Sequence, residues 1–180
     1  DVFTLTASDL GDTFNGYAGA DGFTVAAAQL TTLDTIDGGA GTDTLTITTA
    51  AALVDADFTN VSNVERLVLP AAQTLTAGPL LAASGIERIT ATTGANTLTL
   101  NALAANDMAV VLVAGTDTVN AATMTGALTV SYANDNDLTG ADTITAGTGS
   151  SDSLTVTMAG AAALTAAELA GVTGFETIAT

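Results

Sequence analysis

Acidic side chains are the groups in this sequence whose type and spacing could do chemistry. One short pattern recurs, in which an acidic or amide residue follows a glycine by two places and precedes an apolar residue by two; two copies lack the glycine. The central residue falls at positions 21, 43, 65, 87, 96, 117, 142, 152 and 176, so the first three intervals are identical. Oxygens of such side chains cap the backbone of a turn or bind a hard cation such as Ca²⁺. The spacing therefore predicts a structural repeat whose turns carry caps or metal ligands.

The most specific part of this pattern is the segment 38–46, which matches the calcium-binding nonapeptide Gly-Gly-x-Gly-x-Asp-x-apolar-x in full. In that motif the glycines expose backbone carbonyl groups and the aspartate supplies a carboxylate. A further aspartate lies nine residues before the aspartate of the motif. The candidate calcium ligands here are Asp34, Asp37, Gly39, Gly41 and Asp43. The alternative is a glycine turn that Asp43 caps without any metal.

A second group of oxygen ligands occurs in the segment 134–142. Its candidate ligands are Asn134, Asp135, Asp137 and Asp142. The alternating acidic residues and the glycine at position 140 are similar to the first half of an EF-hand loop. The twelfth position is Ala146 instead of glutamate, and no helices are expected on either side, which excludes a true EF-hand. A calcium loop of another geometry and a solvated Asx turn remain the two alternatives.

Further candidates come from an oxygen-rich stretch at 11–21 and from two more copies of the repeat. These metal-ligand candidates are Asp12, Asp21, Asp117 and Asp152. Two other copies, one repeat apart, place an arginine directly after the acidic residue, at Glu65-Arg66 and Glu87-Arg88. We expect these to stack as a structural Glu–Arg ladder on one face of the fold.

Composition excludes most catalytic chemistry. The chain has no histidine, cysteine, lysine or tryptophan, and its two arginines are its only basic residues. Imidazole bases, thiol nucleophiles, zinc–thiolate sites, Schiff bases and P-loops are therefore excluded. Nucleic acid is a poor partner because phosphate neutralisation needs a basic face. No apolar run approaches the roughly 18 residues that span a bilayer, so no membrane insertion is expected.

A net charge of −17 makes the chain repel itself, and divalent cations are the expected compensation. The alternative is acidity that serves solubility or salt tolerance. Calcium, as several ions, is the cofactor that we expect.

The elements that must position these side chains are short strands. The 37 alanines and 35 threonines make up two-fifths of the sequence, and β-branched residues in alternation favour strands. A repeat of about 22 residues that contains such strands predicts an all-β fold, an irregular parallel β-solenoid with right-handed connections. We expect short helical turns at 50–58 and 164–172, the second with a Thr165/Glu168 capping box. We expect one solenoid segment of a longer protein over 1–180, with 1–90 and 91–180 as its sub-modules.

The segment Leu33–Thr48 (LDTIDGGAGTDTLTIT) is similar to calcium-binding repeat proteins of the RTX type. Together with Asn60–Leu67 (NVSNVERL) it more narrowly resembles Gram-negative bacterial surface-layer proteins and related large surface adhesins. The resemblance implies type I secretion, calcium-dependent folding and assembly of a lattice on the bacterial cell surface. One complete nonapeptide is too few for a regular β-roll, so an irregular β-helix is expected instead.

These features favour a structural protein that assembles with other copies of itself into a lattice or filament, with cell-surface polysaccharide as a further partner. A spacer or stalk segment of a large calcium-dependent adhesin is the alternative. A β-helix enzyme that acts on polysaccharides has the two carboxylates that it needs. It lacks tryptophan platforms and has little positive charge to neutralise a uronate, so we expect no enzymatic activity.

Overall fold

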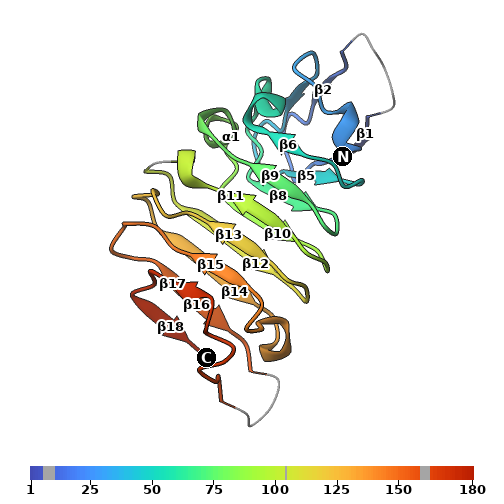
Figure 1. Ribbon diagram of the computed structural model, residues 1–180. Coiled ribbons are helices and arrows are strands. Elements are labelled where there is room, and N and C mark those ends of the chain that lie inside the picture. Colours follow the sequence, from blue (N-terminus) through green and yellow to red (C-terminus); the bar gives the residue numbers. More distant parts are fainter. Residues whose placement is uncertain (6–10, 104, 159–162) are drawn as a thin grey trace.

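The chain is built from strands that pair in parallel (Figure 1). The computed structural model describes residues 1–5, 11–103, 105–158 and 163–180, and these ranges contain 18 strands, one α-helix and four 3-10 turns. Every strand pair within them is parallel. The predicted all-β class and the parallel strand pairing are therefore confirmed.

The largest sheet has nine strands, which follow one another in chain order from one edge to the other. Its strands are β1 (Val2–Thr4), β3 (Gly22–Val25), β5 (Thr44–Ile47), β8 (Arg66–Leu69), β10 (Arg88–Ala91), β12 (Met108–Leu112), β14 (Leu128–Tyr132), β16 (Ser153–Val156) and β18 (Thr177–Ala179). The residues that pair across it are Val2, Gly22, Thr44, Arg66, Arg88, Ala109, Thr129, Ser153 and Thr177. The spacing along this row is nearly constant, and the three intervals from Gly22 to Arg88 are identical, as the acidic repeat predicts.

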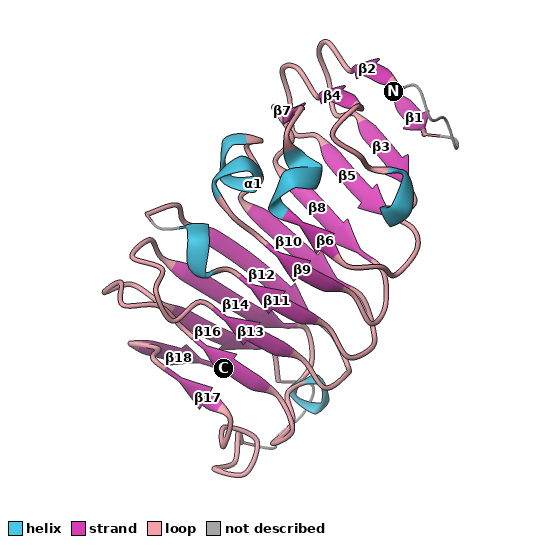
Figure 2. Ribbon diagram, turned by 45° about the horizontal axis from the view of Figure 1, so that its top comes forward, coloured by secondary structure: helices cyan, strands magenta, loops and turns pink. Residues whose placement is uncertain are grey.

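Two smaller sheets receive the strands that lie between those of the large sheet along the chain. The six-stranded sheet contains β17 (Val172–Thr173), β15 (Thr143–Thr145), β13 (Thr118–Asn120), β11 (Thr97–Thr99), β9 (Thr74–Thr76) and β6 (Leu53–Val54). The three-stranded sheet contains β2 (Thr13–Asn15), β4 (Thr35–Asp37) and β7 (Val61–Ser62). We call the chain from one strand of the large sheet to the next a pass. The nine-stranded sheet continues through β10 at residues 88–91 without a break (Figures 1 and 2).

The core follows from the alternation of apolar and polar residues within each strand. In β8, Leu67 and Leu69 are buried, whereas Arg66 is exposed, because successive side chains point to opposite faces of a sheet. The fully buried residues of the central row in the large sheet are Phe23, Leu45, Leu67, Ile89, Val110, Val130 and Leu154. Those of the six-stranded sheet are Leu53, Leu75, Leu98, Val119 and Ile144. Both rows belong to one continuous core, and each buried aliphatic side chain stabilises the fold by about 2 kcal/mol.

Helical segments are short and lie in the connections between strands (Figure 2). The predicted turn at 50–58 forms a 3-10 turn over its second half, η2 (Asp55–Phe58). In the 164–172 segment, Thr165 and Glu168 form the expected reciprocal capping bonds, while β17 begins at Val172. The other 3-10 turns are η1 (Ala27–Gln29), η3 (Asn101–Leu103) and η4 (Asp135–Asp137).

The sequence did not predict the α-helix α1 (Pro79–Ala83). Pro79 occupies the first helical turn, where its missing N–H is not needed. The carboxylate of Asp55, from the preceding pass, accepts the backbone N–H groups of Leu80 and Leu81 at this helix start. None of the helices in the described part of the chain is long and apolar enough to cross a membrane.

Candidate functional site

The acidic residues of the repeat stack along the large sheet and bond to one another's backbones. The Oδ1 atom of Asp43 accepts the backbone N–H of Asp21 at 2.7 Å, across 22 residues. The Oε2 atom of Glu65 accepts the N–H of Asp43, again at 2.7 Å. The same arrangement recurs where Glu176 accepts the N–H of Asp152 at 2.8 Å. We call these five residues the large-sheet ladder.

A second stack precedes the strands of the six-stranded sheet. The N–H of Gln73 donates to Asn96 Oδ1 at 3.0 Å, and the N–H of Asn96 donates to Asp117 Oδ1 at 2.9 Å. The N–H of Asp117 donates in turn to Asp142 Oδ1 at 2.7 Å. All four side chains are buried. We call Gln73, Asn96, Asp117 and Asp142 the small-sheet ladder.

Both ladders solve the same hydrogen-bonding problem. A buried backbone N–H group without an acceptor destabilises a fold by about 1–3 kcal/mol. At every ladder position except the last of each run, which are Glu65, Glu176 and Asp142, the side chain of the next pass supplies that acceptor. Gln73 and Asn96 do so with amide oxygens, so the repeat requires an oxygen acceptor at this point and not a negative charge.

Gln73 is the ladder member that the sequence pattern missed, because it lacks the glycine two places before it and the central residue of every copy found is Asp, Asn or Glu. The signal that could have found it is the shared Thr-Leu-Thr tripeptide, which follows both Gln73 and Asn96 directly.

Four ladder carboxylates keep a second oxygen inside the protein. The Oδ2 atoms of Asp21, Asp43, Asp117 and Asp152 are buried and have no hydrogen-bond partner among the described residues. Glycine makes room for two of them, since a Cβ atom on Gly38 would lie 2.6 Å from Asp43 Oδ2. A Cβ atom on Gly16 would likewise lie 2.6 Å from Asp21 Oδ2.

The other motif glycines permit the close stacking of successive turns. A Cβ atom on Gly39 would overlap the carbonyl oxygen of Tyr17. One on Gly41 would overlap that of Gly19. The segments 16–21 and 38–43 are therefore equivalent turns of neighbouring passes, and the glycines of the nonapeptide are required by the contact between them.

Burial changes the titration of two groups near the small-sheet ladder. Desolvation raises the pKa of Asp117; hydrogen bonds from Asn96 oppose this rise, and the charge of Asp142 adds to it. Desolvation, followed by the charges of Asp142, Asp117 and Asp137, raises the pKa of Tyr132 and keeps its buried hydroxyl neutral. That hydroxyl has no hydrogen-bond partner in the part of the chain that the structure describes.

In the first predicted calcium stretch, Asp34 and Asp37 each cap a local turn and each also bond to a residue of a neighbouring pass. Asp34 accepts the N–H of Asp12 at 2.9 Å and the N–H of Thr31 at 2.8 Å. Asp37 Oδ1 accepts the N–H of Gly39 at 3.1 Å, together with an amide hydrogen of Asn63 at 2.7 Å. Asp34 and Asp37 thus cap backbone N–H groups, as Asp43 does for Asp21. Capping is the alternative to metal binding that the sequence analysis left open for Asp43.

The candidate ligands of the second predicted calcium stretch also take part in separate hydrogen-bonded groups. Asp142 Oδ2 accepts the N–H of Thr139 at 2.6 Å, so this carboxylate joins a local turn to the small-sheet ladder. Asn134 donates to Asp137 at 3.2 Å across η4, which begins at Asp135.

The described residues contain no group of three or more His, Cys, Asp or Glu side chains that could hold a metal ion. A calcium site built mainly from glycine carbonyls and one carboxylate would not be a group of that kind. Calcium binding at the predicted residues therefore stays a prediction.

No protein-family model, no curated protein and no solved structure matches this chain at a significant level.

Proposed function

We propose that this chain is a calcium-stabilised β-solenoid segment of a self-assembling bacterial surface layer, secreted to the cell surface. The observation that carries the proposal is the strand order of the nine-stranded sheet, where each pass adds one parallel strand beside the last. Folds that repeat a unit in this way stack it into a solenoid. Parallel crossover connections are right-handed in nearly all proteins, which is the hand that we propose here.

The two edges of this sheet have the geometry to pair with a further parallel strand. Among the described residues, the edge strands β1 and β18 each pair with one neighbouring strand, so a further parallel strand, from the same protein or from another copy, could add beside each. Val2 in β1 is 82% exposed and Ile178 in β18 is 46% exposed. Exposed apolar side chains on an unpaired parallel edge favour the addition of another strand.

The net charge of the chain and its stacked glycine turns support the calcium part of the proposal. The net charge of −17 opposes both folding and contact between copies, and bound Ca²⁺ would reduce that repulsion. Extracellular calcium sites have dissociation constants of about 0.1–1 mM. At about 1 mM calcium, each such site would stabilise the fold by about 0.4–1.4 kcal/mol.

The test is circular dichroism of the purified chain with light scattering in the same cuvette, during titration with calcium and then with EGTA. We expect calcium to increase the β signal and the particle size together, and EGTA to reverse both. Magnesium at the same concentration is the control for charge screening. A complete β spectrum in EGTA that calcium does not change would contradict the calcium part of the proposal.

A spacer segment of a large adhesin is the second candidate. The observation that favours it is the continuity of the sheet, whose nine strands span about 40 Å at the usual spacing of parallel strands. A stack of this kind is a stiff rod that could hold a binding domain away from the cell. Ordering by calcium without growth of particles would favour this candidate over the lattice.

A further inference from the structure

The only two basic residues of the chain lie side by side on the large sheet. Arg66 in β8 and Arg88 in β10 are paired in register, and both side chains are exposed. Paired residues on neighbouring strands are about 5 Å apart, and like charges placed there repel each other. The stacked arginines of the expected Glu–Arg ladder are thus present.

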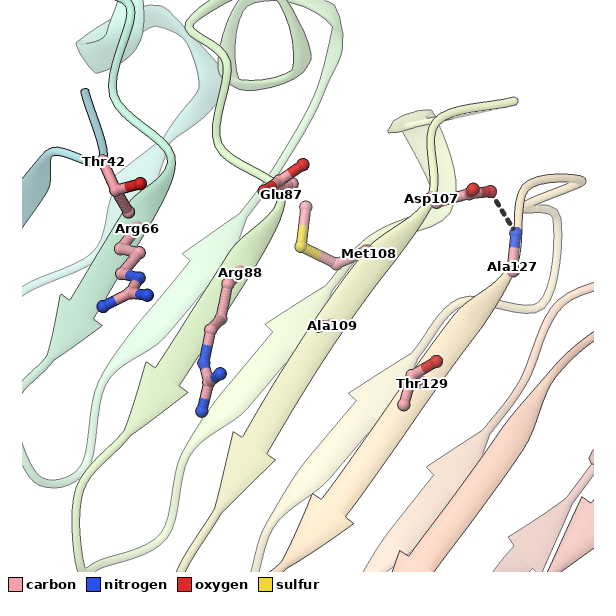
Figure 3. A pocket seen from close by; sticks show the side chains of 9 residues that line it. All are labelled: Thr42, Arg66, Glu87, Arg88, Asp107, Met108, Ala109, Ala127 and Thr129. Atoms are coloured by element: carbon pink, nitrogen blue, oxygen red, sulfur yellow. Dashed lines mark hydrogen bonds between the residues drawn. The ribbon is translucent and has the colours of Figure 1, made fainter. Parts of the chain in front are cut away.

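No ion pair joins the glutamates and arginines of this stack among the described residues. Neither guanidinium takes part in a salt bridge there, and neither donates a hydrogen bond. Glu65 instead caps the backbone of the preceding pass, at Asp43. Figure 3 shows both arginine side chains extended in the same direction along their strands, away from Glu87. The N–H donors of both guanidinium groups therefore have no partner among the described residues, although the chain has a net charge of −17.

The arginines line a hollow of about 470 Å³ on this face, a size within the range of small-ligand sites. It extends from Thr42 and Arg66 across β10 and β12 to Thr129 in β14 (Figure 3). Small residues, among them Ala109 and Ala127, lie between the charged groups and leave the space open.

Two carboxylates line the same hollow. Glu87 has an exposed side chain that accepts no hydrogen bond from any described residue. Asp107 uses Oδ1 to accept the N–H of Ala127 at 2.8 Å. The hollow therefore combines two guanidinium donors with two carboxylate acceptors.

This combination selects a chemical class of ligand. Two adjacent guanidinium groups bind a carboxylate through paired hydrogen bonds. The carboxylates of Glu87 and Asp107 accept hydrogen bonds from hydroxyl groups, but repel a compact, densely charged anion such as phosphate. A ligand that satisfies both sides is rich in hydroxyl groups and has widely spaced carboxylates.

We propose that Arg66 and Arg88, with Glu87 and Asp107, form a binding site for an acidic oligosaccharide of uronate type. The arginines bind a sugar carboxylate, and the two acidic residues bind hydroxyl groups. None of the described residues that line the hollow is aromatic, so we expect a modest affinity, with a dissociation constant of about 1 mM. The site does not depend on assembly and is tested in the unassembled chain.

The experiment is isothermal titration of the purified chain in EGTA, under salt conditions in which circular dichroism shows that the chain keeps its β structure, because calcium alone could bridge uronates to an acidic protein. The probes are trigalacturonic acid, the neutral trisaccharide maltotriose and inorganic phosphate. We expect binding of the uronate at least tenfold tighter than binding of either other probe. Equal binding of phosphate or of maltotriose overturns the proposed ligand class, and no uronate binding up to 10 mM overturns the site.

Matched variants identify the groups responsible. Arg66→Gln and Arg88→Gln should each weaken uronate binding at least fivefold, and the double variant should abolish it. Thr24→Gln, on the same outer face in β3, is the control and should bind as the unaltered chain does. Equal losses in the control and in the arginine variants would overturn the assignment, with circular dichroism used to verify that each variant folds.

The variant Glu87→Gln tests the acidic side separately. It removes a negative charge while keeping a polar side chain of similar size. We expect uronate binding to fall less than fivefold and phosphate binding to rise. Unchanged phosphate binding would contradict the role of Glu87 in selection against compact anions.

Discussion

At the scale of single residues, the acidic positions of this chain act first as hydrogen-bond acceptors. Asn96 occupies the same type of ladder position as Asp117, and its side-chain amide also donates to the carbonyl oxygen of Gly94 at 2.9 Å. An amide can therefore replace a carboxylate if a nearby carbonyl accepts its N–H. The charge at the other ladder positions is then available for another purpose, such as the binding of cations.

Substitution at Asp43 separates the acceptor from the charge. Asp43→Ala removes the acceptor of the Asp21 N–H and should lower the free energy of unfolding by about 1–3 kcal/mol. Asp43→Asn keeps an oxygen acceptor and should cost less than about 1 kcal/mol when measured in EGTA by urea denaturation. Equal losses in both variants would contradict a capping role. A loss in Asp43→Asn that appears only with calcium present would instead indicate a metal ligand.

Asp117 gives a prediction about pH. Its pKa is raised in the folded chain because burial disfavours the carboxylate, so the folded state binds more protons than the unfolded state as pH falls towards the ordinary pKa of aspartate. This group therefore destabilises the fold at neutral pH and does so less as the pH falls. The stability of Asp117→Asn relative to the unaltered chain should therefore be highest at pH 7. This relative stability should fall between pH 7 and pH 3 in urea denaturation series, and a relative stability that rises towards pH 3 would contradict the raised pKa.

At the scale of elements, the turns are shaped by contact between passes. Gly38 lies where an added Cβ atom would overlap the carbonyl oxygen of Asn63, whereas one on Gly22 would lie 3.9 Å from its nearest neighbour, the carbonyl oxygen of Asp1. The two glycines belong to the same repeat and differ in what surrounds them. Glycine is thus required where a neighbouring turn approaches closely, as at Gly38, and is not required where none does, as at Gly22.

A pair of alanine substitutions tests this difference. Gly38→Ala must displace the backbone of the next pass and should lower the melting temperature by several degrees, corresponding to about 2 kcal/mol or more. The Cβ atom added by Gly22→Ala makes only an ordinary van der Waals contact at the start of a strand, so this substitution should leave the melting temperature unchanged or slightly raised. Similar effects of the two substitutions would contradict the stacking of turns as the cause.

At the scale of the whole molecule, a narrow core and a large negative charge oppose each other. The apolar rows of the sheets stabilise the stack, while the net charge of −17 repels one pass from the next. Screening by salt and binding of cations both relieve this repulsion, and they differ in the concentration that they need.

Salt and calcium should therefore stabilise the chain over different ranges. We expect sodium chloride between 10 and 500 mM to raise the melting temperature gradually in EGTA, because screening strengthens over this range. Calcium should produce a comparable rise at about 1 mM, and magnesium at that concentration should produce less. If calcium and magnesium act equally at the same ionic strength, screening alone accounts for the effect.

The sequence by itself determined the strand class, the parallel pairing and the register of the repeat, because alternation and spacing are properties of the chain alone. The short helix α1 was missed since its start depends on the carboxylate of Asp55, which lies 25 residues away from Leu80. The role of the acidic residues was open for the same reason, because a carboxylate that caps and one that binds a metal have the same local sequence. Only the tertiary structure placed the N–H of Asp21 against Asp43, and only it showed that the stacked Arg66 and Arg88 have no partner among the described residues. Such contacts join residues of different passes, and they exist only once the chain has returned to stack on itself.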